Sequence, residues 1–323
     1  MTPAFTAPAT SAPSSTPTFG STPTPEPTAT LVPGPLVSTQ WLADHLGSES
    51  LVLLDATVVL IGTPSGKARY LSGLDEHLID GHIPGAIFAE LFEVFSDPSK
   101  SFGFARPTAA LFEQGAASVG VDNNTTVVVY DSSLNQWAAR IWWQFRAAGY
   151  DNVAVLDGGL TKWRAEGRDT ETGYNEPREV AGFTAVPRPE LWVDKDVVAG
   201  IVAGATDAAL ICALPGKDYS GETGDRARRG HIPGSVSVPA GRLIDRATNT
   251  FHRGEELASR FARVSPGRPV VAYCSGGIAS AASALALTLA GHDNVAIYDG
   301  SLNEWAADAA APLEVGADQP AQP

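Results

Sequence analysis

Short apolar runs alternate along the chain with longer segments that have helical spacing. The runs 51–55, 127–131 and 153–157 each place four apolar or aromatic residues before an aspartate. Runs of this length suit parallel strands that are covered on both faces, and the segment 136–148 has the length and spacing of a helix. The alternation predicts an α/β fold with a doubly wound, mainly parallel sheet flanked by helices.

The same order of motifs recurs about 150 residues further on, so the chain contains two copies of one unit. The segments 209–212, 270–274 and 293–300 repeat the segments 52–55, 127–131 and 151–158. Both copies also contain Gly-His-Ile-Pro-Gly, with His82 and His231, and a Leu-x-x-Trp that ends at Trp163 and Trp305. We therefore expect two α/β domains with the same topology.

Composition predicts the limits of these domains. Residues 1–35 are mostly Thr, Pro, Ala and Ser, with too few large apolar groups to offset chain entropy, and we expect a disordered tail. Residues 168–190 are polar and contain proline, as is typical of a linker. The predicted domains are thus 36–167 and 191–313, and a short C-terminal tail, 314–323, follows them.

Charge and composition argue against several classes of partner. The net charge of −14 disfavours nucleic acid, and no apolar run approaches the about 18 residues of a membrane helix. The N-terminus lacks a basic segment followed by an apolar core, so we expect no secretory signal. Two cysteines, Cys212 and Cys274, suit a reducing compartment, and we expect a cytoplasmic protein.

The two copies differ at the end of the Val-rich run, where the first has Asp131 and the second has Cys274. Cys274 opens a Gly-Gly loop that leads directly into an Ala-rich helix, so backbone N–H groups and the helix dipole should stabilise a thiolate or a bound anion there. Asp131 is expected to cap the helix that follows it. The predicted active-site loop consists of Ser275, Gly276, Gly277, Ile278, Ala279 and Ser280.

Together these motifs resemble the rhodanese superfamily, specifically the tandem thiosulfate and mercaptopyruvate sulfurtransferases, over about residues 36–313. The resemblance implies two rhodanese-like domains, of which only the second keeps the cysteine. It further implies that Cys274 takes a sulfane sulfur from thiosulfate or mercaptopyruvate and holds it as a persulfide. A thiol, a thioredoxin-like protein or cyanide would then accept the sulfur. No metal-ligand or nucleotide-binding pattern occurs, so we expect no metal and no cofactor.

A negatively charged protein must hold an anionic donor through local cations. Leu214 and Asp218 stand where the family usually has arginines, so Arg69, Arg228 and Arg229 are the candidates for substrate binding. An alternative is that the chain is a low-turnover persulfide carrier or a regulatory binding module. A phosphatase of the same fold would need arginine where Ser280 stands, which argues against that class.

Cys212 and His82 each have two interpretations. Cys212 ends a predicted strand and suits a core position, although a resolving thiol that attacks the persulfide is the alternative. His82 and His231 lie in identical turns, which favours a structural role for both rings. Because the first-copy histidine can face the cleft between tandem domains, His82 is also a candidate to contact substrate.

Overall fold

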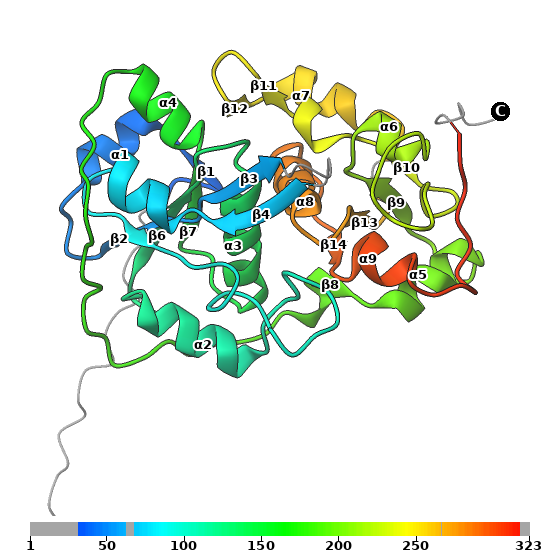
Figure 1. Ribbon diagram of the computed structural model, residues 1–323, viewed down its shortest axis with the longest axis horizontal. Coiled ribbons are helices and arrows are strands. Elements are labelled where there is room, and N and C mark those ends of the chain that lie inside the picture. Colours follow the sequence, from blue (N-terminus) through cyan, green and yellow to red (C-terminus); the bar gives the residue numbers. More distant parts are fainter. Residues whose placement is uncertain (1–31, 63–67, 266, 317–323) are drawn as a thin grey trace, which may run out of the picture.

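The computed structural model describes residues 32–62, 68–265 and 267–316, and two five-stranded parallel sheets organise this part of the chain (Figure 1). The first sheet has the order β1-β7-β6-β2-β5, with β1 Leu36–Val37, β2 Leu51–Asp55, β5 Ile87–Phe88, β6 Thr126–Tyr130 and β7 Val153–Leu156. The second has the order β10-β9-β13-β14-β8, with β8 Trp192–Val193, β9 Ala209–Cys212, β10 Val236–Ser237, β13 Val270–Tyr273 and β14 Val295–Tyr298.

The two sheets are copies of one another. Read from its other edge, the second order becomes β8-β14-β13-β9-β10, and each strand then corresponds to the first-sheet strand with the matching motif. The predicted runs coincide with β2 and β9. The strands β7 and β13 end one residue earlier than predicted, and β6 both begins and ends one residue earlier. The α/β fold with tandem domains is therefore confirmed.

Helices cover both sheets. Their bounds are α1 Thr39–His45, α2 Ala109–Ser118, α3 Gln136–Ala147, α4 Gly159–Ala165, α5 Lys195–Val202, α6 Gly216–Tyr219, α7 Gly254–Arg260, α8 Ala279–Leu289 and α9 Ser301–Trp305. Short π and 3₁₀ turns lie at Glu76–Asp80, Pro189–Leu191 and Ala240–Arg242. None of the helices in the described ranges is both long and apolar enough to cross a membrane.

The two domains meet along α3 and α8, which lie side by side at the centre of the molecule (Figure 1). Ten of the 12 residues of α3 are buried, as expected for a helix that packs against its own sheet on one side and against a second domain on the other. The Ala-rich sequence of α8 lets the backbones of the two helices approach closely. These helices follow Asp131 and Cys274, so the interface lies beside both loops.

Each domain also sends a β-hairpin toward the loop of the other. In the first domain, β3 Val58–Gly62 pairs with β4 Ala68–Ser72, and this hairpin extends toward α8 (Figure 1). In the second, β11 Ile244–Asp245 pairs with β12 Thr250–Phe251, and the turn between them contacts the Asp131 loop.

Most of the predicted N-terminal tail, residues 1–31, lies outside the described residues, as do residues 317–323. Residues 32–35, which composition assigns to the tail, pack on the first sheet. The Val32 side chain is buried, and the carbonyl of Pro35 accepts a hydrogen bond of 2.9 Å from the Val155 N–H. The exact domain limits stay a prediction.

Candidate active site

Cys274 lies just beyond β13, at the carboxyl edge of a parallel sheet, where ligand sites of such sheets form. Only 2% of the surface of Cys274 is exposed to solvent. The Cys274 N–H donates to Ser301 Oγ at 3.1 Å, and its carbonyl accepts from the Leu302 N–H at 3.1 Å. The Asn303 N–H donates to the Ser275 carbonyl at 2.8 Å. The repeated Asp-Gly-Ser-Leu segment therefore supports the cysteine loop.

The geometry of the loop requires Gly277, and a side chain at Gly276 would displace a neighbour. Gly277 has a φ of +83°, and a Cβ there would lie 2.7 Å from Arg140 Nη1. A Cβ on Gly276 would lie 2.8 Å from the side-chain nitrogen of Asn303. The close approach lets the loop turn sharply into α8, where the buried Ser280 Oγ lies 3.6 Å from Cys274 Sγ.

Asp131 shows what this loop geometry can hold. Its Oδ1 accepts hydrogen bonds from the N–H groups of Ser133 at 2.8 Å and Asn135 at 3.1 Å. Its Oδ2 accepts from the N–H groups of Trp137 and Ala138, both at 3.0 Å. Burial raises the pKa of this carboxyl, and the same N–H groups oppose the rise. Asp131 thus caps α3, and in the first copy a carboxylate fills the loop.

The first-copy loop is also covered by the second domain. Asn249, in the turn between β11 and β12, donates from Nδ2 to the carbonyl of Gly158 at 3.0 Å and to the carbonyl of Ser133 at 2.5 Å. Asn135 Nδ2 donates in return to the Asn249 carbonyl at 2.7 Å. This loop is therefore closed by a hairpin and carries no nucleophile.

Tyr70, on β4 of the first domain, comes close to the second-copy loop and was missed from the sequence. Partial burial raises the pKa of its phenol, although 46% of the residue stays exposed, and the neighbouring Cys274 and Asp225 add to the rise while Arg226 opposes it. The ring packs edge-on against Trp137, with centroids 5.3 Å apart. Tyr70 therefore stays neutral near pH 7 and can donate a hydrogen bond beside the thiol.

Arg226 is the second residue that the sequence did not single out. It is partly buried, and its Nη2 donates to Ser275 Oγ in the cysteine loop. Its Nε is buried without a hydrogen-bond partner among the described residues. A cavity of about 420 Å³ lies beside it, and Phe102, Arg228 and Asn303 are among its other lining residues. This cavity offers a local positive charge next to the loop.

The predicted arginines have different surroundings. Arg69 is exposed, and because successive residues of a strand point to opposite faces, it lies on the face of β4 away from Tyr70. Arg228 donates to the carbonyls of Asp308 and Ala311, both at 2.5 Å, and so holds the C-terminal segment while it lines the cavity beside Arg226. Arg229 is exposed.

His82 is fully buried inside the first domain. Its Nδ1 lies 2.8 Å from the His77 carbonyl, which can only accept, and its Nε2 lies 3.2 Å from the side-chain nitrogen of Asn175. His231 repeats this arrangement, with Nδ1 2.9 Å from the Tyr219 carbonyl. Both rings therefore bind the backbone of their own domain, which fits the structural interpretation.

Cys212 is fully buried at the end of β9, in register with Tyr273 on β13. Residues in register share a sheet face, so the Cys212 side chain lies on the same face as Tyr273. Cys274 is the next residue after Tyr273, so its side chain leaves the strand toward the opposite face. Burial raises the pKa of the Cys212 thiol to about 12. This environment suits a core residue better than a nucleophile.

Comparison with known proteins agrees with this architecture. The family model for the rhodanese-like domain matches residues 38–166 and 217–308. Thiosulfate/3-mercaptopyruvate sulfurtransferase 2 of Arabidopsis thaliana is 34% identical over 298 residues, which cover 84% of each chain. The 3-mercaptopyruvate sulfurtransferase of Escherichia coli is 31% identical over 86% of this chain and 97% of that protein. A crystal structure of an E. coli 3-mercaptopyruvate sulfotransferase superposes with a TM-score of 0.73 at 30% identity, over 83% of this chain and 98% of that one.

The fold, the duplicated loops and these relatives define a protein of the rhodanese class. The chain belongs to the rhodanese-like family, among the tandem-domain sulfurtransferases of the thiosulfate/3-mercaptopyruvate type.

Proposed function

We propose that this chain transfers a sulfane sulfur through a persulfide on Cys274. The observation that carries the proposal is the contrast between two equivalent loops. In the first, the carboxylate of Asp131 accepts four backbone hydrogen bonds, and in the second the same position holds a thiol. A loop that can surround an anion with N–H groups, and that carries a nucleophile, suits sulfur transfer.

The chemistry has two steps. The Cys274 thiolate attacks the outer sulfur of thiosulfate, or the thiol sulfur of mercaptopyruvate, and a new S–S bond forms as the bond to the leaving group breaks. From thiosulfate, sulfite leaves with the bonding electron pair. From mercaptopyruvate, the enolate of pyruvate leaves and takes up a proton. In the second step a thiol or cyanide attacks the outer sulfur of the persulfide, and the Cys274 thiolate is regenerated.

Several groups could stabilise these species. The N–H groups that correspond to those around Asp131 belong to Gly276, Ile278, Ser280 and Ala281. The first three would stabilise the persulfide anion, because the Ala281 N–H already donates to the Ile278 carbonyl at 3.0 Å. Arg226 could attract the negative charge of the donor from the neighbouring cavity. The neutral phenol of Tyr70 could donate a hydrogen bond to a leaving enolate. We infer that Arg226 takes the substrate-binding role more directly than Arg69, Arg228 or Arg229.

The donor is tested by assaying cyanide-dependent thiocyanate release from thiosulfate and from mercaptopyruvate in parallel. We expect turnover with at least one donor and its loss in Cys274→Ala, while Cys212→Ala serves as the matched control and keeps most of the activity. Turnover that survives in Cys274→Ala would contradict the proposal. A chain that becomes persulfidated but turns over with neither donor would instead be the carrier or binding module.

The acceptor and the compartment follow from the same chemistry. The Cys274 thiol must stay unoxidised between turnovers, and both Cys212 and Cys274 are free. We therefore propose a reducing compartment such as the cytoplasm. A small thiol or a thioredoxin-like protein would be the acceptor there.

A further inference from the structure

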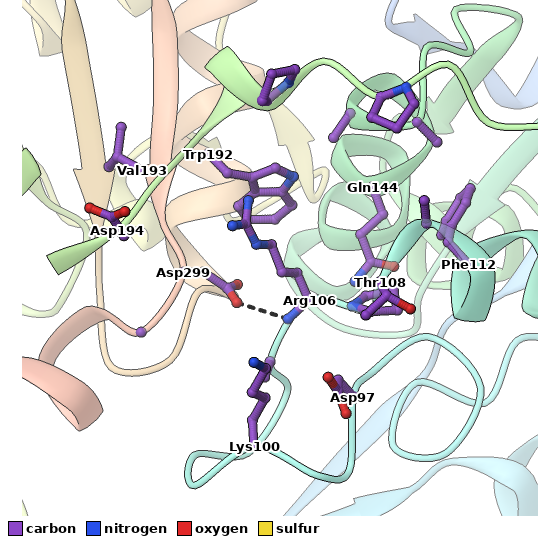
Figure 2. Close-up of a pocket in the computed structure, with 18 of the residues that line it drawn as sticks. Asp97, Lys100, Arg106, Thr108, Phe112, Gln144, Trp192, Val193, Asp194 and Asp299 are labelled. Carbon is purple, nitrogen blue, oxygen red and sulfur yellow. Dashed lines mark hydrogen bonds between the residues drawn. The ribbon is translucent and has the colours of Figure 1, made fainter.

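A second cavity, of about 590 Å³, lies between the two domains beside the C-terminal end of α3 (Figure 2). Its walls come from segment 97–112, from α3, from segment 185–189 and β8, and from the turn after β14. Cys274 and its loop are not among the residues that line it. The volume falls within the range of small-molecule sites, about 300 to 1,000 Å³.

Gln144, on α3, has an unused hydrogen-bond acceptor at this cavity. Its side chain is nearly buried, with 4% of the residue exposed, and Nε2 donates to the Phe95 carbonyl at 2.9 Å. That bond fixes the orientation of the amide, because a carbonyl can only accept. Oε1 then receives no hydrogen bond from any residue in the described ranges. A buried acceptor of this kind destabilises the fold unless a donor reaches it.

The available charge at the cavity is positive. Arg106 and Lys100 both line it, and neither forms an ion pair with a carboxylate among the described residues. Figure 2 shows the Arg106 side chain lying against Trp192, and its guanidinium carbon is 5.5 Å from the ring centroid. A third cation, Arg188, is already held by Asp151 at 2.7 and 2.5 Å.

The carboxylates around the cavity are already engaged. Asp97 Oδ1 accepts from the Ser99 N–H at 3.0 Å; hydrogen bonds from Ser99 lower the pKa of this carboxyl, and the charge of nearby Lys100 adds to the effect. Asp299 accepts from Arg140 at 2.6 Å and from the Arg106 N–H at 2.8 Å. Glu304 accepts from the Tyr298 hydroxyl at 2.7 Å, and Asp194 caps α5. The two unpaired cations are therefore free to bind an anion, whereas these acids are less able to bind a cation.

Much of the remaining wall is apolar, although Ser101 and Thr108 also line it. Trp192 and Phe112 contribute aromatic rings, and Ala105, Pro107 and Pro187 add further apolar surface. An apolar wall with a few separated polar groups is the usual composition of a site for a small organic molecule.

We propose that this cavity binds a small organic carboxylate that has an apolar body and carries an N–H or O–H group. The carboxylate pairs with Arg106 and Lys100, the donor satisfies Gln144 Oε1, and the apolar body packs on Trp192 and Phe112. This site goes beyond the sulfur-transfer function, because it shares no lining residue with the Cys274 loop and only Ser101 and Phe102 with the cavity beside Arg226.

Isothermal titration calorimetry on the full chain tests the proposal with N-acetyl-L-phenylalanine as the probe. We expect binding, and we expect 3-phenylpropionate, which lacks the N–H, to bind about tenfold more weakly. N-acetyl-L-phenylalanine amide, which lacks the carboxylate, should lose at least as much. Absence of binding at about 10 mM probe, or equal binding of all three compounds, would overturn the proposal.

Substitutions in the protein test the same contacts that the three probe compounds test. Arg106→Gln and Gln144→Met should each weaken the probe about tenfold. Arg268→Gln removes an exposed arginine that is paired with Asp207 away from the cavity, and it should leave the affinity unchanged, as should Cys274→Ser. If Cys274→Ser abolishes binding while Arg106→Gln retains it, the probe occupies the sulfur-transfer site and the inference is wrong. Should Gln144→Met not fold, the 3-phenylpropionate comparison tests its contact in the wild-type chain.

Discussion

Arg140 crosses the domain interface from α3, and its removal should weaken both the fold and the cysteine loop. The residue is 0% exposed, and its guanidinium donates to Asp299 Oδ1 at 2.6 Å, to the Phe104 carbonyl at 2.7 Å and to the Gly277 carbonyl at 3.3 Å. It also lies 4.8 Å from the centroid of Trp192. In Arg140→Met the apolar volume remains, but Asp299 keeps a largely buried charge without its cation.

The magnitude follows from that uncompensated charge. Removing one partner of a buried ion pair costs about 3 to 5 kcal/mol. We expect Arg140→Met to lower the free energy of unfolding by this amount. Arg140→Lys keeps the charge but loses the planar fork that reaches three acceptors, so it should lose about half as much. Turnover should fall in both variants, because Gly277 would lose a contact that positions the loop.

Urea unfolding, followed by tryptophan fluorescence and by circular dichroism, measures the loss. A double-mutant cycle with Asp299→Asn isolates the pair, since the double variant no longer buries a lone charge. We expect the two single losses to exceed the loss in the double variant by about 1 to 3 kcal/mol. Additive losses, or a loss below about 1 kcal/mol in Arg140→Met, would refute the account of a buried ion pair.

Three further predictions concern individual residues of the site. At pH 8, iodoacetamide should leave Cys212 unmodified in the native chain. A thiol with a pKa of about 12 is ionised in only roughly one molecule in ten thousand at this pH. Peptide mapping that finds Cys212 labelled before Cys274 would contradict this. Gly277→Ala should lower stability in thermal unfolding, and turnover in the thiocyanate assay, more than Gly291→Ala does. Both glycines have a positive φ, so alanine adds about 1 to 2 kcal/mol of strain at either position, but only at Gly277 would its Cβ also meet Arg140. Equal losses in the two variants would count against the contact with Arg140. Tyr70→Phe should lower kcat with mercaptopyruvate about tenfold and affect thiosulfate less, since only the enolate needs a proton; an equal effect on both donors would argue against proton donation.

The sequence was sufficient for the features that depend on local pattern. The apolar runs predicted β2 and β9 at their observed bounds, because strands buried on both faces leave a continuous signal. The duplication predicted two sheets with the same order. The position of Cys274 followed from a strand, two glycines and a helix, which are all adjacent in the chain.

The contacts made between domains could not be predicted in this way. Tyr70 lies on a hairpin close to the Cys274 loop, which is about 200 residues further along the chain. Nothing in the sequence around Tyr70 indicates this contact. Arg226 and Arg228 are two residues apart in one irregular segment, and their different partners depend on how that segment folds. The sequence around Arg140 predicts only an ordinary helix residue, because its partners Gly277 and Asp299 belong to the second domain.

The most direct test of the central claim is to treat the protein with each sulfur donor in the absence of acceptor, trap persulfides by alkylation and analyse the peptides by mass spectrometry. We predict one additional sulfur atom on the peptide that contains Cys274, none on the peptide that contains Cys212, and loss of the added sulfur when cyanide is supplied. Sulfur found on Cys212, a disulfide between the two cysteines, or full turnover without any modification of Cys274 would contradict the account.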